Sequence, residues 1–137
     1  MRVVVDTNCL LVSISRKSQY NWLFQALIDK KFELCLSTEI LEEYEEIIGR
    51  YFSPETVEPV YEILTTASNI KKVEVSFRLQ LIHNDLDDNK FVDCAFAGNA
   101  NYIVTNDTHY DILKTIDFPK FNIISITAFK EVLDKIQ

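Results

Sequence analysis

The sequence predicts an α/β fold, with three layers (α/β/α) around a mostly parallel central sheet. Short runs rich in β-branched residues alternate with longer segments of helical periodicity. This alternation is typical of parallel strands joined by right-handed helical crossovers. Only two glycines and three prolines punctuate the 137 residues, and no repeat or low-complexity segment occurs. We therefore expect one continuous domain over residues 1–137.

The first predicted elements are two strands with a helical segment between them. Residues 2–5 (Arg-Val-Val-Val) form a short β-branched run, which predicts a buried strand. Residues 9–30 show helical periodicity, and the polar residues 16–18 predict a break within it. The apolar run at residues 32–36 predicts the second strand.

Two helices and a strand are predicted next. Ser37 or Thr38 is placed to cap a helix in which apolar side chains recur every three or four residues. Gly49 and the proline five residues later predict the end of this helix. Another helix is expected over residues 55–67, followed by a strand at residues 70–75.

The last third of the chain repeats the alternation. The polar residues 84–89 open a helix, and the apolar run at residues 102–105 predicts a strand. A further helix is expected to end near Ile116, and residues 121–126 predict the last strand. Thr127 is then expected to cap the closing helix.

Composition and charge limit the classes of function. The formal net charge is −7, whereas proteins that bind nucleic acid broadly through phosphates are usually basic. An enzyme that gathers carboxylates around a metal ion is compatible with this charge, because the ion supplies the positive charge. The opening apolar run stops at Asp6, so neither a signal peptide nor a membrane span is expected.

The cysteines indicate a reducing environment. Cys9, Cys35 and Cys94 are scattered, odd in number and lack the CxxC spacing of zinc sites. We expect buried free thiols and a cytoplasmic location.

Three aspartates are the first candidates for a functional site. Asp6 follows the first strand, Asp107 follows the strand at residues 102–105, and Asp88 begins a helix. Taken singly, each is better explained as a helix N-cap. However, the carboxyl ends of parallel strands share one edge of a sheet, so at least two of these acids should meet there. Carboxylates held together repel unless cations neutralise them, and hard oxygen ligands suit Mg²⁺ or Mn²⁺.

One glutamate of the helix after the second strand joins this group in our interpretation. The helical wheel turns Glu42 and Glu46 away from the apolar face, and Glu39 mostly outward. Glu43 and Glu45 border that face, and Glu43 is nearer to the helix start. We choose Glu43 as the site residue and interpret the other glutamates as solvated.

With these residues placed, the sequence resembles the PIN-domain nucleases, as found in bacteria, over nearly its whole length. No single motif is decisive, but their order and spacing are fairly specific. The matching segments are residues 3–8 (Val-Val-Val-Asp-Thr-Asn), 37–44 (Ser-Thr-Glu-Ile-Leu-Glu-Glu-Tyr), 88–95 (Asp-Asn-Lys-Phe-Val-Asp-Cys-Ala) and 102–107 (Tyr-Ile-Val-Thr-Asn-Asp).

The resemblance implies a PIN-like fold, a site for one or two Mg²⁺ or Mn²⁺ ions, and hydrolysis of single-stranded RNA. Many bacterial members are toxins of toxin–antitoxin pairs, so the resemblance implies a small antitoxin protein as a possible partner. No association with a membrane is expected, and a homodimer is possible. The implied metal-holding and catalytic residues are Asp6, Glu43, Asp88 and Asp107.

Several further residues complete the hypothesis. Asp93, deeper in the helix that Asp88 begins, is an additional candidate ligand, whereas Asp85 and Asp87 are interpreted as loop or cap residues. Beyond these, Asn8, Ser37 and Thr105 are candidates to orient ligands or water. The candidate phosphate contacts are Arg16, Lys17 and Lys90, each of which is also explained as a solvated surface charge.

Other functions fit the sequence less well. No glycine-rich phosphate loop is present, and His83 and His109 are lone histidines for which surface or loop roles are expected. The main rival is a non-catalytic PIN-fold module that binds a protein or RNA partner. An incomplete acid set would favour that rival, but all four positions are acidic here.

Overall fold

The computed structural model describes residues 1–83 and 85–136. Across these residues, five strands form one entirely parallel sheet in the order β3-β2-β1-β4-β5. This confirms the predicted parallel α/β sheet. The strands are β1 (Arg2–Val5), β2 (Glu33–Leu36), β3 (Ile70–Lys72), β4 (Tyr102–Val104) and β5 (Ile123–Ile124).

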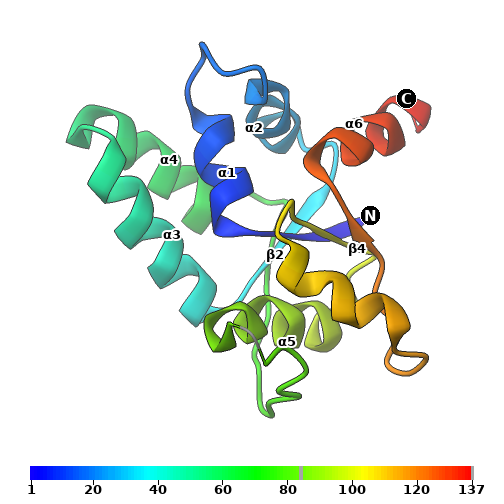
Figure 1. Cartoon of the computed structure of the whole chain (residues 1–137). Coiled ribbons are helices and arrows are strands. Elements are labelled where there is room, and N and C mark those ends of the chain that lie inside the picture. Colours follow the sequence, from blue (N-terminus) through cyan, green and yellow to red (C-terminus); the bar gives the residue numbers. More distant parts are fainter. Residues whose placement is uncertain (84, 137) are drawn as a thin grey trace.

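Helices cover both faces of the sheet (Figure 1). Helix α5 packs against the central strands on one face, whereas α1, α2 and α6 lie on the other side of β1 in the same view. The helices in the described ranges are α1 (Thr7–Ile14), α2 (Asn21–Ile28), α3 (Thr38–Tyr51), α4 (Pro54–Thr66), α5 (Asn89–Ala97) and α6 (Ile126–Lys135), with 3₁₀ helices η1 (Leu86–Asp88) and η2 (Thr108–Thr115).

The centre of the core lies on β1. The valines of β1 are almost completely buried, as expected for a strand with neighbours on both sides and helices on both faces. The buried hydroxyl of Tyr44 in α3 donates a hydrogen bond to the carbonyl oxygen of Val5. This contact brings α3 to the end of β1, where the first candidate acid follows.

Most predicted elements are confirmed, including the interruption of the first helical segment near residues 16–18. The predicted end of one helix and the predicted start of another are wrong.

The first is the end of helix α3, which continues through Gly49 to Tyr51. This exposed glycine only lowers helix stability, and the break comes before Pro54. Asn84, the first residue of the predicted polar stretch, lies outside the described residues.

The closing helix is capped by Ser125 rather than Thr127. The Ser125 hydroxyl accepts a hydrogen bond from the amide of Ala128 at 3.0 Å. The reason for the earlier start is that Ile126 is 1% exposed and belongs to the core-facing side of the first turn.

The three cysteines are free and buried, as predicted. In the ranges 1–83 and 85–136, none of the helices has both the length and the apolar character needed to cross a membrane.

Candidate functional site

Asp6 and Asp107 lie side by side at the carboxyl edge of the sheet. The strands that precede them, β1 and β4, are direct neighbours, with Val5 paired to Val104. The Asp6 amide extends this pairing by donating to the carbonyl oxygen of Val104 at 3.0 Å. The predicted meeting of two strand-terminal acids is therefore observed.

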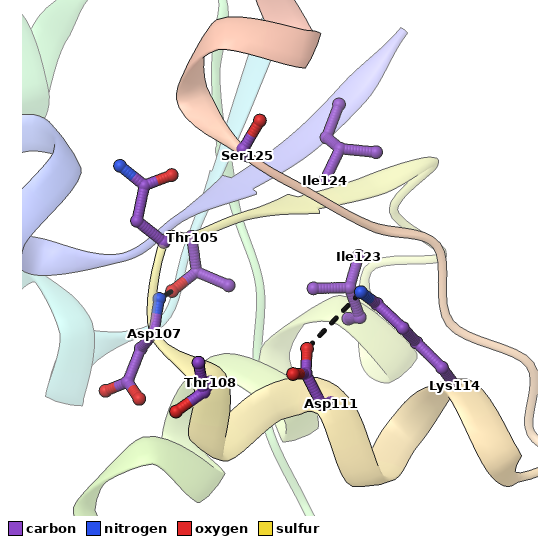
Figure 2. Close-up of a pocket in the computed structure, with 9 residues that line it drawn as sticks. Thr105, Asp107, Thr108, Asp111, Lys114, Ile123, Ile124 and Ser125 are labelled. Atoms are coloured by element: carbon purple, nitrogen blue, oxygen red, sulfur yellow. Dashed lines mark hydrogen bonds and ion pairs between the residues drawn. The ribbon is translucent and has the colours of Figure 1, made fainter.

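Thr105 links these two acids. Its hydroxyl donates to Oδ2 of Asp6 at 2.7 Å and accepts a hydrogen bond from the backbone amide of Asp107 at 3.0 Å. Figure 2 shows Thr105 beside the backbone of Asp107, whose carboxylate points away from the cavity lined by Asp111 and Lys114. Thr105 is thus placed to fix the orientation of Asp6, as the sequence suggested.

The environment of Asp6 disfavours its charge. Burial raises the pKa of the Asp6 carboxyl above its ordinary value, against the hydrogen bonds from Thr105 and the Asn8 amide that lower it. The nearby charges of Asp107 and Glu43 raise the pKa further. Asp6 therefore lies in a group of acids that a bound cation would stabilise.

Asp88 joins the same group from the start of α5. Burial is the largest cause that raises its pKa to about 6, followed by the charges of Asp85, Asp107 and Asp6. Its Oδ2 atom is buried and has no hydrogen-bond partner among the described residues. A carboxylate in this setting requires a proton or a cation.

Two of the three aspartates cap helices, as the sequence suggested for each of them singly. Capping a helix does not prevent them from also binding a metal ion. Asp6 accepts from the amide of Asn8, and Asp107 accepts from the amide of His109 at 2.8 Å. Within the described residues, the side chain of Asp88 forms no cap hydrogen bond. Asp6 and Asp107 cap helices and also converge, whereas the position of Asp88 is not explained by capping.

Glu43 contacts the site in a different way. Its two carboxylate oxygens are held by the hydroxyl of Thr7 and by Nζ of Lys90, the latter at 2.7 Å. The Lys90 and Glu43 side chains are only 13% and 25% exposed. Lys90 therefore lies at the acidic edge, as a phosphate contact would, but its ammonium is paired with Glu43.

The predicted orientation of α3 agrees with the structure. Glu43 is half-buried and faces the acids, whereas the neighbouring glutamates are exposed on the helix surface. Two of the exposed glutamates form ion pairs with arginines away from the site, at 2.5 Å for Glu46 with Arg50 and 2.9 Å for Glu39 with Arg78.

Asp93 and Ser37 have other contacts in the structure. One oxygen of the buried Asp93 accepts from the amide of Leu79 at 2.9 Å, and the charges that act on Asp93 are those of Arg78 and Glu39. The structure therefore does not group Asp93 with the converging acids. Ser37 caps α3 by accepting from the amide of Ile40.

Arg16 and Lys17 are also not brought to the acids. Both are exposed in the turn after α1, whereas Asp6 precedes that eight-residue helix. A helix of this length separates its two ends by about 12 Å. Arg16 lines a different cavity of about 500 Å³ together with Phe24 and Phe52.

Four residues that sequence reasoning did not select lie at the site. His109 Nδ1 is 3.3 Å from Oδ1 of Asp107 and 3.5 Å from Oδ2 of Asp88. Asp85 caps η1 as expected, yet it also lies beside Asp88. Thr7 contacts Glu43, and the buried hydroxyl of Tyr110 finds no hydrogen-bond partner in the described part of the chain. Of these four residues, His109 is the one whose sequence position could have indicated a place at the site, because it lies two residues after Asp107.

A cavity of about 310 Å³ opens beside Asp6 and Asp107. It lies between the start of α1 and the end of β4, so a ligand inside it would meet the acids directly. Its other lining residues are Asn8, Cys9, Val12, Tyr20 and Asn106.

The residues fit a divalent metal ion. Asp85, Asp88 and His109 each offer a ligand atom within 4.8 Å of the others. The unpartnered, buried Oδ2 of Asp88 points to a missing positive charge, and the remaining acids supply the oxygen ligands that Mg²⁺ and Mn²⁺ prefer.

Comparison with known proteins agrees with this geometry. A family model described as "PIN domain" matches residues 2–109. The fold resembles a chain of VapBC2 from Rickettsia felis, solved bound to a DNA fragment from their promoter, with 18% identity, a TM-score of 0.61 and coverage of 91% of this chain and 98% of that one. It also resembles a chain of FitAcB from Neisseria gonorrhoeae, with 11% identity, a TM-score of 0.57 and coverage of 91% and 98%. No curated protein matches the sequence. At these identities the structural likeness shows the fold, and because the family model spans most of the sequence, the chain belongs to the PIN-domain family.

Proposed function

We propose that residues 1–137 form a single PIN domain that hydrolyses phosphodiester bonds of single-stranded RNA with Mg²⁺ or Mn²⁺. The observation that carries this proposal is the convergence of Asp6, Asp88 and Asp107, with one buried oxygen of Asp88 unpartnered among the described residues. Membership of the PIN-domain family supports the same reaction class.

The side chains at this site would have different roles. Asp6, Asp88 and Asp107 would hold the ion, and Thr105 would keep Asp6 turned toward it. When bound, the ion polarises the phosphate and lowers the pKa of a bound water, which supplies a nucleophile at neutral pH.

Glu43 and Lys90 would act beside the ion. The Lys90 ammonium is directed to the acidic edge by Glu43, which Thr7 also holds. An ammonium at that place would attract the phosphate backbone of an RNA strand and offset part of the repulsion from the acids. Asn8 lines the cavity beside Asp6, where it would contact the RNA or a water molecule bound to the ion.

Cleavage of RNA by the purified chain tests the proposal. We expect cleavage of some single-stranded RNA with Mn²⁺ or Mg²⁺ and none with excess EDTA. Asp6→Asn keeps the cap geometry but loses a ligand charge, so it should lower the cleavage rate by more than about a hundredfold, beyond the usual cost of removing a residue that merely supports a ligand. Undiminished activity in Asp6→Asn would mean either that a contaminating nuclease cleaves the RNA or that Asp6 is not part of the site. Metal binding without cleavage of any RNA in a random-sequence library would favour the non-catalytic binding module.

We further propose that the protein acts as the toxin of a toxin–antitoxin pair in a bacterium. The support is the fold likeness to chains of VapBC2 and FitAcB. Induced expression of the wild-type chain in bacterial cells should slow growth, and Asp6→Asn should not. Co-expression of a small protein encoded by the neighbouring gene should restore growth. Normal growth with wild-type protein present at equal abundance would contradict the toxin role.

A further inference from the structure

We propose that His109 supplies a nitrogen ligand to the metal site, together with Asp85 and Asp88, so that the site prefers later transition metals to Mg²⁺ more strongly than a site with oxygen ligands alone. This inference rests on the proposed metal-dependent function and concerns the metal preference of the same site. It is carried by the contacts of His109 and by the unsatisfied atoms around it.

The backbone of His109 is fixed beside the acids by Asp107. Asp107 accepts from the backbone amide of His109 at 2.8 Å, so the side chain leaves η2 directly beside the acids. Nδ1 then lies 3.3 Å from Asp107 and 3.5 Å from Asp88. One ligand atom from each of Asp85, Asp88 and His109 lies within 4.8 Å of the others. Ligands at about 2.1 Å from one ion lie up to about 4.2 Å apart, so the three atoms need only a small inward movement.

Unsatisfied buried atoms point to a missing centre between these residues. Asp88 is 9% exposed, and its Oδ2 atom faces Nδ1 of His109, yet neither atom has a hydrogen-bond partner among the residues described. The completely buried hydroxyl of Tyr110 lies beside Asp88, and it too has no hydrogen bond of normal geometry among the described residues. Buried polar atoms are almost always satisfied in folded proteins, and a cation bound by Asp88 and His109 would satisfy the first two of these atoms.

A charged His109 acting as a simple counter-ion explains the contacts less well. An imidazolium paired with a carboxylate forms aligned hydrogen bonds of about 2.7–2.9 Å. The observed separations of 3.3 Å from Asp107 and 3.5 Å from Asp88 are longer than these distances. Among the basic side chains of the described residues, only His109 comes within ion-pair distance of Asp88 or Asp107. A metal ion between the ring and the carboxylates would satisfy both sets of atoms.

The nitrogen ligand has a measurable consequence. Imidazole suits Ni²⁺, Zn²⁺ and similar ions, whereas Mg²⁺ is bound by oxygen. Isothermal titration of the untagged full chain with Ni²⁺ and with Mg²⁺ should therefore be compared for wild type, His109→Gln and His83→Gln. His83, the other histidine of the chain, is exposed and serves as the matched control. We expect His109→Gln to weaken Ni²⁺ binding by at least about tenfold and Mg²⁺ binding by less than about threefold, with no change in His83→Gln.

Pulsed electron paramagnetic resonance on the wild-type protein with Mn²⁺ adds a readout that does not depend on a variant folding. A ¹⁴N coupling to Mn²⁺ is expected in wild type and in His83→Gln, and its loss is expected in His109→Gln. Unchanged relative affinities in His109→Gln, or tighter binding of both ions, would show that the ring is a counter-ion and overturn the inference while the proposed function stands. Failure of the wild-type chain to bind any divalent ion would overturn both.

Discussion

The acids at the carboxyl edge of the sheet form two groups that are neutralised in different ways. One group, called the α3 end, is Glu43 with its partner Lys90, and the other, called the α5 end, is Asp88 with the aspartates around it. At the α3 end, both oxygens of Glu43 are held by the chain itself, through Thr7 and the ammonium of Lys90. At the α5 end, Asp88 faces Asp85, Asp107 and Asp6, and the pKa of Asp88 is raised to about 6 by burial and by these charges.

This difference separates two requirements of a nuclease site. The α3 end already contains a fixed cation, which can meet a phosphate without an added ion. The α5 end stores repulsion that only a proton or a bound cation relieves. We therefore expect substitutions at the α3 end to act on cleavage and packing, and substitutions at the α5 end to act on metal binding and pH dependence.

The largest expected effect concerns the role of Glu43 in cleavage. Glu43→Gln loses the charge that holds the Lys90 ammonium beside the acids, so the cleavage rate should fall by about ten- to a hundredfold. The matched controls Glu42→Gln and Glu46→Gln lie on the exposed face of α3 and should retain nearly full activity. Rates measured on one RNA with Mn²⁺ test this, and equal losses in all three variants would contradict the placement of Glu43.

The next effect concerns the internal ion pair. Lys90→Met removes the partner of a largely buried carboxylate, which should cost about 2 kcal/mol of unfolding free energy without metal. Lys114→Met is the matched control, because its ion pair with Asp111 is more than half exposed and should contribute less than about 1 kcal/mol. Urea unfolding in EDTA measures both. Equal costs for the two variants would mean that Lys90 does not neutralise Glu43.

The pH dependence of stability isolates the α5 end. The carboxyl of Asp88 has an ordinary pKa of 3.8 and a folded-state pKa of about 6. Between these values the folded protein keeps a proton that the unfolded chain loses, so this group lowers stability as the pH rises through that window. Asp88→Asn lacks the effect. Without metal, it should therefore be more stable than wild type above pH 6, by about 1–2 kcal/mol once screening by water is allowed for.

Urea unfolding of wild type and Asp88→Asn between pH 4 and 7.5 measures this difference. The gap should widen with pH and become constant above the folded-state pKa of about 6. A gap that does not change with pH would show that Asp88 remains ionised throughout and that the acids do not repel each other in the folded protein.

The sequence predicted the sheet and two of the aspartates for a clear physical reason. Strand runs and helix periods depend on local patterns, and the residue that follows a parallel strand is confined to one edge of the sheet. Asp6 and Asp107 could therefore be placed without coordinates. Glu43 followed from the helical wheel, because the period of a helix fixes which side each residue faces.

The remaining contacts depend on packing that no local pattern encodes. The pairing of Lys90 with Glu43 joins the start of α5 to the middle of α3, and Asp88 meets His109 only because η2 returns over the same edge. Sequence reasoning left His109 as a surface or loop residue for this reason. Asp93 is the opposite case, because its position in the sequence suggested a ligand whereas one oxygen of its side chain accepts a hydrogen bond from the amide of Leu79.

The smallest expected effect tests that assignment of Asp93. Its carboxylate accepts from the amide of Leu79 at 2.9 Å and lies under a segment without regular structure, so Asp93→Ala should cost about 1 kcal/mol of unfolding free energy. Because Asp93 is not grouped with the converging acids, the melting temperature of Asp93→Ala should rise with Mn²⁺ as much as that of wild type. Asp88→Ala, the matched variant at the N-cap of the same helix, should lose most of that rise. Thermal unfolding of the three proteins with EDTA and with Mn²⁺ makes the comparison. If Asp93→Ala loses the Mn²⁺ response as fully as Asp88→Ala, Asp93 is a metal ligand after all, and the difference between the two ends of the acidic edge would have to include it.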